Sequence, residues 1–135
     1  MPLQSFTLHA SQAETATGAS SVFTVQDVPD AVTVFVNVTA NSGTTPTLDM
    51  YLQGSYDGQT WIDLASSAQW TTTNNAQIFG FTAQGAIHSA AFTTTDATLA
   101  ASTTRTVVIP SLLRLKWKLG GTTPSYTFVA KAQVR

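Results

Sequence analysis

The sequence predicts an all-β protein, and we expect a single-domain antiparallel β-sandwich of jelly-roll or Greek-key type. Apolar residues recur at every second position in several short segments, which is the period of a strand with one buried face. Gly, Pro, Asn and Asp separate these segments, as turns require. Two sheets with one apolar face each bury those faces against each other. An immunoglobulin-like sandwich is the alternative, although the cysteine pair of that fold is absent.

Length and composition exclude several protein classes. The 135 residues suit one domain, residues 1–135, with a core of its own. The chain has no cysteine, so neither a disulfide framework nor a thiolate site is expected. No apolar run reaches the roughly 18 residues that span a bilayer, and the first residues lack the features of a signal peptide. Composition therefore argues against a multidomain enzyme, a disulfide-rich secreted module and a membrane protein.

Charged residues are scarce and segregated. They make up 10% of the chain, whereas about 25% is usual, and 24 Thr and 12 Ser take their place. All seven acids precede residue 100 and all six bases follow it. Few charges leave little to keep copies apart in solution. Either Thr and Ser cover a monomer, or much of the surface is buried against other proteins.

The N-terminal third predicts three strands. We expect short strands around residues 6–8 and 23–25. Residues 32–38 then place four valines on one face. A turn at residues 43–46, which contain Gly and Pro, follows.

The clearest hairpin joins residues 48–53 to residues 60–64. Asp57-Gly58 in its turn can adopt positive φ. With Gly54 opposite Thr60, both strands bury the same face. The other face carries three side chains that we expect to be solvated or covered by a neighbouring subunit: Tyr51, Trp61 and Asp63.

Residues 65–104 are weakly patterned. Short strands are expected at 77–82, 86–92 and 97–101, between Thr-rich runs. A long, weakly hydrophobic stretch of this kind is typical of loops or edge strands that a partner orders.

The C-terminal third predicts a strand at 105–109, stopped by Pro110, and then a hairpin of residues 112–119 and 126–134. If the hairpin strands pair, five bases share one sheet surface. That surface could be solvated, dock an acidic protein surface, or bind nucleic acid. Aromatic stacking partners are predicted to point inward, which argues against nucleic acid. The five bases are Arg114, Lys116, Lys118, Lys131 and Arg135.

Catalytic machinery is not evident. His9 and His88 have no acid and nucleophile in a recognisable spacing, and we interpret both as surface or interface groups. Asp49 and Asp63 are near in the predicted hairpin but are interpreted as solvated. No Ca²⁺-loop spacing or Gly-rich phosphate loop occurs. We predict no catalytic residue, no metal site and no cofactor.

Aromatic side chains offer a second interpretation. A cluster of them on a β-sandwich is typical of a sugar-stacking platform in carbohydrate-binding modules, but a face covered by a neighbouring subunit has the same composition. The candidates are Tyr51, Tyr56, Trp61 and Trp70.

Two stretches resemble small virion proteins of tailed bacteriophages: residues 48–65 (LDMYLQGSYDGQTWIDLA) and residues 113–128 (LRLKWKLGGTTPSYTF). The resemblance implies a non-enzymatic structural protein, in particular a capsid decoration or cement protein that binds the outer shell as a trimer. Its partners would be the major capsid protein, other virion proteins and further copies of itself. It would assemble in the host cytoplasm and reside on the capsid surface.

The expected interface combines the apolar and Thr-rich surface of residues 65–104, buried between copies, with charged faces that orient the protein on the shell. A tail or head-tail connector component, a carbohydrate- or receptor-binding module, and a hydrolase are the alternatives. The candidate interface residues are Tyr51, Trp61, Asp63, Trp70, Arg114, Lys116, Lys118, Lys131 and Arg135.

Overall fold

The structure is all-β, as the sequence predicts. It is a computed structural model that describes residues 4–25, 30–82, 92–105 and 107–135. Within these ranges one antiparallel sheet of seven strands is present, and no helix could cross a membrane. The strands are β1 (Gln4–Glu14), β2 (Gly18–Ala19), β3 (Phe23–Thr24), β4 (Ala31–Ser55), β5 (Ile62–Ser66), β6 (Ala76–Thr82) and β7 (Leu112–Val134).

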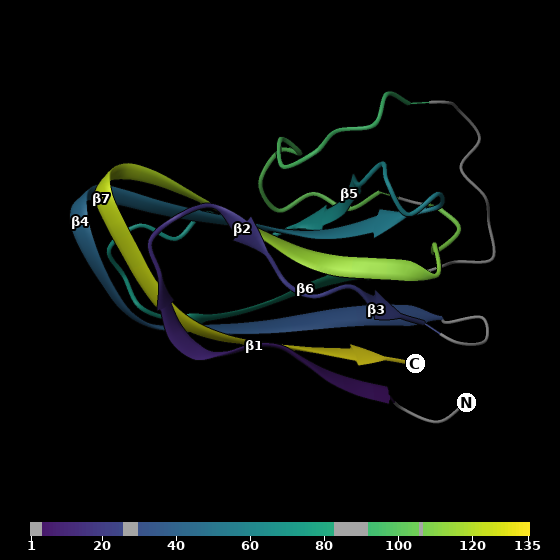
Figure 1. Ribbon diagram of the computed structural model, residues 1–135, viewed down its shortest axis with the longest axis horizontal. Helices are drawn as coiled ribbons and strands as arrows, with labels where there is room; N and C mark the ends of the chain where they lie inside the picture. The colour runs from purple at the N-terminus through teal and green to yellow at the C-terminus, as the bar shows by residue number, and fades with distance from the viewer. Residues whose placement is uncertain (1–3, 26–29, 83–91, 106) are drawn as a thin grey trace.

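Two long strands, β4 and β7, form the spine of the sheet. They pair with each other over nearly their whole lengths, and the ribbon that they form bends sharply at the left of Figure 1 and returns over itself. The first layer contains β1, β6 and the outer arms of the spine, residues 31–38 and 126–134. The second layer contains β2, β3, β5 and the inner arms, residues 48–55 and 112–119. The predicted sandwich of two layers is therefore built from one continuous sheet.

The bend depends on backbone conformations that ordinary strand residues avoid. Three register shifts interrupt the ladder within residues 38–47. Gly43 and Gly121 have φ of 117° and 99°, and Thr45 and Thr123 each have φ of 46°. A Cβ atom on Gly43 would lie 2.7 Å from the carbonyl oxygen of Thr123. The two strands thus turn together, with glycines where their backbones approach most closely.

The hairpin predicted at residues 112–119 and 126–134 is wrong. Both segments belong to β7, and the turn expected at residues 120–124 is a bend inside that strand. The turn expected at residues 43–46 is likewise a bend inside β4. Alternating hydrophobicity identifies the buried face of a strand but not its hydrogen-bonding partner, so it could not show that the two bent strands pair with each other.

The predicted inward faces of the long strands are confirmed. Val34 and Val36 are fully buried in the first layer, and Met50 and Leu115 are fully buried in the second. Together with the other inward-facing residues of both layers, they form one hydrophobic core. The alternation of side chains along each arm therefore places the core between the layers.

The hairpin of β4 and β5 forms in a different register from the predicted one. Gly54 lies opposite Ile62 rather than Thr60, and a bulge follows Leu52. The reason is a wide turn: the Asp57 carboxylate accepts the backbone N–H groups of Gln59 and Thr60, at 2.8 and 2.7 Å. These bonds keep the two residues out of the ladder.

The middle of the chain contains fewer strands than predicted. The strand expected at 77–82 is confirmed as β6, whereas 97–101 and the described part of 105–109 are irregular. Apart from Phe92, the strand expected at 86–92 lies outside the described residues. The irregular segments make isolated backbone bonds to β5, such as Arg105 N to Leu64 O at 2.8 Å.

Replacing Gly43 with Ala should lower the free energy of unfolding by about 1–3 kcal/mol, because the left-handed φ and the 2.7 Å approach to Thr123 O both disfavour a Cβ. Chemical denaturation measures this change. The exposed neighbour Ser42 changed to Ala is the control, with an expected effect below about 0.5 kcal/mol. Equal stability of Gly43→Ala and the unchanged chain would contradict the role of this glycine in the bend.

Candidate functional site

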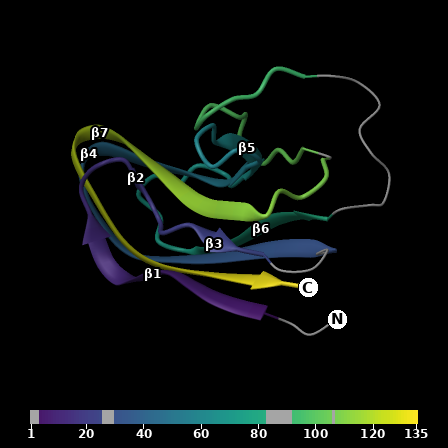
Figure 2. The same cartoon turned by 45° about the vertical axis from the view of Figure 1, so that its right-hand side comes forward.

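The candidate residues of β4, β5 and β7 gather on the outer side of the second layer. Gln53 pairs in register with Arg114 on one side and with Asp63 on the other. Side chains at paired positions project from the same face of a sheet. Residues 92–105, here called the covering segment, lie over this face near β5 in the green part of the ribbon (Figures 1 and 2).

Asp63 is the anchor of the covering segment. Its carboxylate is buried, with the residue 2% exposed, so the expectation of a solvated carboxylate is wrong. A buried carboxylate requires hydrogen-bond donors, and the covering segment supplies most of them. The donors are Gln53 Nε2 (2.9 Å), Thr95 Oγ1 (2.8 Å) and the backbone N–H groups of Ala97 (2.8 Å), Thr98 (3.0 Å) and Leu99 (3.1 Å).

Gln53 connects a cation to two carboxylates. Its Oε1 accepts a hydrogen bond from Arg114 Nε at 2.9 Å, while its Nε2 donates to Asp63 and, at 2.7 Å, to Asp96. The guanidinium of Arg114 lies over the ring of Trp61, 4.3 Å from its centroid. Burial lowers the pKa of Arg114, and the negative charge of Asp96 opposes that shift. Both ends of the Gln53 amide are therefore bonded within the chain.

A small second core lies beneath the covering segment. Tyr51, Ala97 and Leu99 pack together, and each is nearly buried. Burial raises the pKa of Tyr51 to about 12, and nearby carboxylates add to the shift. Lys118 Nζ donates to the carbonyl oxygen of Ala97 at 3.3 Å. The face that the sequence predicts to be covered by a neighbouring subunit is thus covered by the chain itself.

Trp70 also lies inside the chain. It is 2% exposed, its backbone pairs with that of Leu48, and its Nε1 donates to Asn75 O at 3.2 Å. Because Tyr51, Asp63 and Trp70 are buried, the prediction that they contact another protein is wrong. Trp61 and Arg114 are half-buried against each other.

The predicted surface of five bases is wrong as well. Arg114, Lys116 and Lys118 belong to the second layer, whereas Lys131 and Arg135 lie at the end of the chain in the first layer. The bend in β7 separates the two groups. Lys131 and Arg135 are exposed, and Lys131 lies opposite residue 35 of β4.

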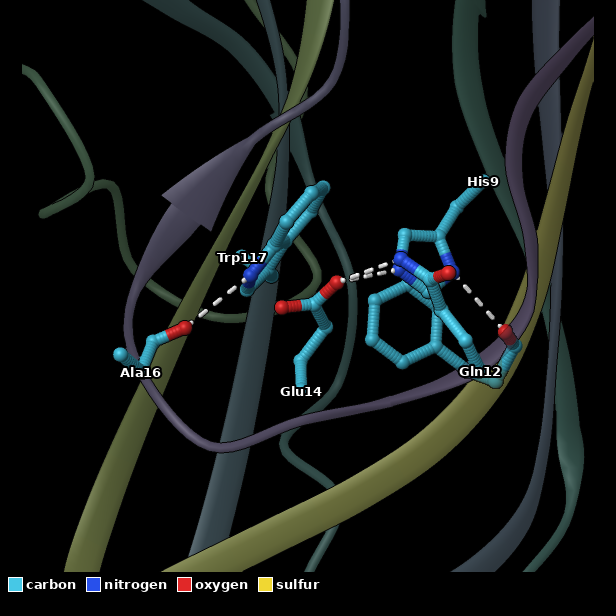
Figure 3. A network of polar contacts seen from close by, with 6 residues as sticks. His9, Gln12, Glu14, Ala16 and Trp117 are labelled. Atoms are coloured by element: carbon cyan, nitrogen blue, oxygen red, sulfur yellow. Dashed lines mark hydrogen bonds and ion pairs between the residues drawn. The ribbon is translucent and has the colours of Figure 1, made fainter.

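His9 is buried, so its interpretation as a surface group is wrong. Its Nδ1 lies 2.9 Å from the carbonyl oxygen of Phe128, and its Nε2 lies 2.8 Å from Glu14 Oε1 (Figure 3). The ring stacks on Phe128 at 3.9 Å between centroids and meets Trp117 edge-on. Gln12 Nε2 donates to the same carboxylate at 3.1 Å. Both ring nitrogens of His9 therefore face acceptor oxygens.

This His9 network attaches β1 to β7 across two register shifts in their ladder. The hydrogen bond from His9 lowers the pKa of Glu14. Trp117 Nε1 donates to Ala16 O at 3.2 Å and holds the chain just after β1 (Figure 3). His88 lies outside the described residues.

A pocket of about 480 Å³ opens beside the turn between β4 and β5. Tyr56, which is 63% exposed, lines it together with Asp57, Ile62 and Phe92. Asp57 accepts backbone bonds of its own turn, and these lower its pKa to about 2. In the described part of the chain, no group of three His, Asp or Glu side chains could hold a metal ion.

Three residues of the network were missed by sequence reasoning: Gln53, Thr95 and Asp96. A glutamine on the same predicted strand face as Asp63 is a weak signal of a buried pair, since the predicted register places Gln53 opposite Trp61. Nothing in the pattern of residues 92–105 shows that their backbone N–H groups converge on a carboxylate in β5, because that contact is nonlocal.

Comparisons with known proteins give one structural likeness. No family model matches the chain, and no curated protein matches it. Among solved structures, the SPBc2 prophage-derived protein YomS is similar, with a TM-score of 0.45 and 14% identity over 98% of this chain and 92% of that chain.

Replacing Asp63 with Asn should release the covering segment, because an amide NH₂ would face backbone N–H groups that need an acceptor. We expect a loss of about 2–4 kcal/mol in the free energy of unfolding. We also expect faster amide hydrogen exchange at Ala97, Thr98 and Leu99, measured by NMR. Asp49→Asn is the control, because the Asp49 carboxylate accepts from the exposed Gln69. Unchanged exchange in Asp63→Asn would show that the carboxylate does not hold the segment.

Replacing Glu14 with Gln should flatten the acid dependence of stability. The pKa of Glu14 is lower in the folded chain than its ordinary 4.5, so its stabilisation is complete above that pH and declines below it. Thermal unfolding between pH 3 and pH 6 should therefore show a smaller loss of Tm toward acid in Glu14→Gln. Gln12→Ala, which keeps the His9 bond to Glu14, is the control. Parallel Tm curves for Glu14→Gln and the unchanged chain would refute the contribution of the His9–Glu14 pair.

Proposed function

We propose that the chain is a non-enzymatic structural subunit of a phage virion, a capsid decoration or cement protein that oligomerises and binds the outer shell. The observation that carries this proposal is that the Asp63 network binds other parts of the same chain. Asp63 accepts bonds from the covering segment, and Gln53 and Arg114 bind each other. The cluster that most resembles a polar active site thus holds the covering segment against the second layer.

The stretch that resembles virion proteins supports the same role. Residues 48–65 contain Gln53, Asp57, Trp61 and Asp63. These side chains join the hairpin to the covering segment, close its turn and stack on Arg114. The residues that carry the resemblance therefore stabilise the hairpin and the covering segment. This role is expected in a rigid subunit whose surface docks on other proteins.

Charge supports docking on a shell. Lys131 and Arg135 are exposed in the first layer, whereas in the second layer Arg114 binds Gln53 and Lys118 binds Ala97 O. An exposed basic group of this kind orients a subunit against an acidic surface more than it adds affinity. A tail or head-tail connector component is the alternative within the same class.

The pocket beside Tyr56 favours one candidate from another class, a carbohydrate-binding module. An exposed aromatic ring next to a carboxylate is a common arrangement for stacking a sugar. Tyr51 and Trp70, which were expected in such a platform, are buried. This second function therefore depends on Tyr56 and Asp57.

The virion proposal is tested on particles from the phage that encodes the chain. An antibody against the purified chain should label the heads in electron microscopy, and preimmune serum should not. Label on tails would replace the decoration role with a tail or connector role. Absence of label from particles would overturn the proposal. A specific glycan-array signal that disappears in Tyr56→Ala would favour the sugar-binding function instead.

A further inference from the structure

The two edges of the first layer are protected very differently. β1 is interrupted by two register shifts, and it carries the charged Glu14. β6 (AQIFGFT) pairs with β4 in unbroken register and has neither a charged residue nor a proline. Soluble proteins usually protect an edge strand with bulges, charges or prolines, because an unprotected edge pairs with other strands. β6 lacks all three.

The outward backbone groups of β6 are identified by the register. Val38 N donates to Asn75 O at 3.0 Å, so alternate residues from position 75 onward bond to β4. Ile78 consequently turns its N–H and C=O away from β4. None of the described strands pairs with β6 on that side.

Space is present beside this edge. A groove of about 260 Å³ separates residues 77–80 from residues 66–68 and from the end of the covering segment. Thr104 Oγ1 reaches across it to Gly80 O, at 3.4 Å. The backbone of Ile78 therefore borders open space.

Exposed apolar side chains concentrate at the same edge. Ile78 is 71% exposed and lies directly opposite Phe35 of β4, which is 40% exposed. One strand further from the edge, the position opposite Phe35 is the exposed Lys131 of β7. A partner lying flat on the layer would cover this lysine, whereas a strand added beyond β6 would cover Ile78. The distribution favours edge addition.

We propose that β6 is the self-association edge of the chain, and that two copies pair their β6 strands antiparallel about a two-fold axis near Ile78. Two identical uncharged strands meet without repulsion, and a two-fold contact uses the same patch on both copies. The stripe of Phe35 and Ile78 then continues into the same stripe of the second copy. Each copy supplies hydrogen-bond partners for the outward N–H and C=O of Ile78 in the other.

This inference rests on the proposed function, because self-association is part of the structural role, and it adds the surface through which copies associate. It gives a two-chain species, however, and not the trimer that the resemblance implies. A trimer requires a different patch on each side of every contact, which β6 pairing with β6 does not provide.

Light scattering of the purified full chain over a concentration series tests the pairing. The chain should have a two-chain mass, and Ile78→Lys should weaken the dimer by about 100-fold or more. Val22→Lys is the matched control, because Val22 is another exposed aliphatic residue (49%) and lies away from β6. A one-chain or three-chain mass for the unchanged chain overturns the inference. Equal weakening by both lysine variants also overturns it.

A cysteine variant keeps the test valid if Ile78→Lys does not fold. The chain has no cysteine, so Ile78→Cys introduces a single thiol. Mild oxidation should yield a disulfide-linked pair quickly, because the pairing places the two thiols side by side, and Val22→Cys should react far more slowly. Equal rates overturn the inference. If the chain is a monomer in solution but the antibody labels phage heads, the β6 pairing alone is refuted. If the chain is a dimer but the antibody labels no particle, the virion function alone is refuted.

Discussion

The constraint on which the structure depends is the ladder between β4 and β7, which persists through a sharp bend. Two strands of this length could form a flat ribbon with one face exposed to water. The register shifts and left-handed residues at the bend return the ribbon over itself, so its apolar face is buried against its own second half. The other strands add to this ribbon, which supplies the walls of both layers.

Asp63 provides the second constraint. A sandwich made from one folded ribbon leaves the outer face of each layer available. On the second layer, the covering segment closes that face by directing backbone N–H groups at a buried carboxylate. The segment has few apolar anchors of its own, chiefly Ala97 and Leu99 packed on Tyr51. Hydrogen bonds to the buried Asp63 carboxylate therefore order the covering segment, which hydrophobic burial alone would hold weakly.

The two layers consequently present different surfaces. The second layer is covered by residues 92–105, to which Lys118 is bonded, while Arg114 is bonded to Gln53 of β4. The first layer keeps an open outer face, with a basic residue in β7 and apolar residues toward β6. In a chain with 10% charged residues, this asymmetry leaves the outer face of the first layer available for the docking that we propose. A structural subunit with one internally closed face and one docking face is consistent with that arrangement.

The sequence by itself determined the fold class and the buried face of each long strand, because both follow from local alternation. It also identified the positive φ of Gly58 in the Asp57 turn. Only the tertiary structure decided that β7 is one strand, that Lys131 lies in a different layer from Arg114, and that Asp63 and His9 are buried. The physical reason is that partners distant in the chain, such as Asp63 and Leu99 or His9 and Phe128, meet only in the folded chain. Alternating hydrophobicity along a strand predicts which face a side chain lies on, but not which segment covers that face.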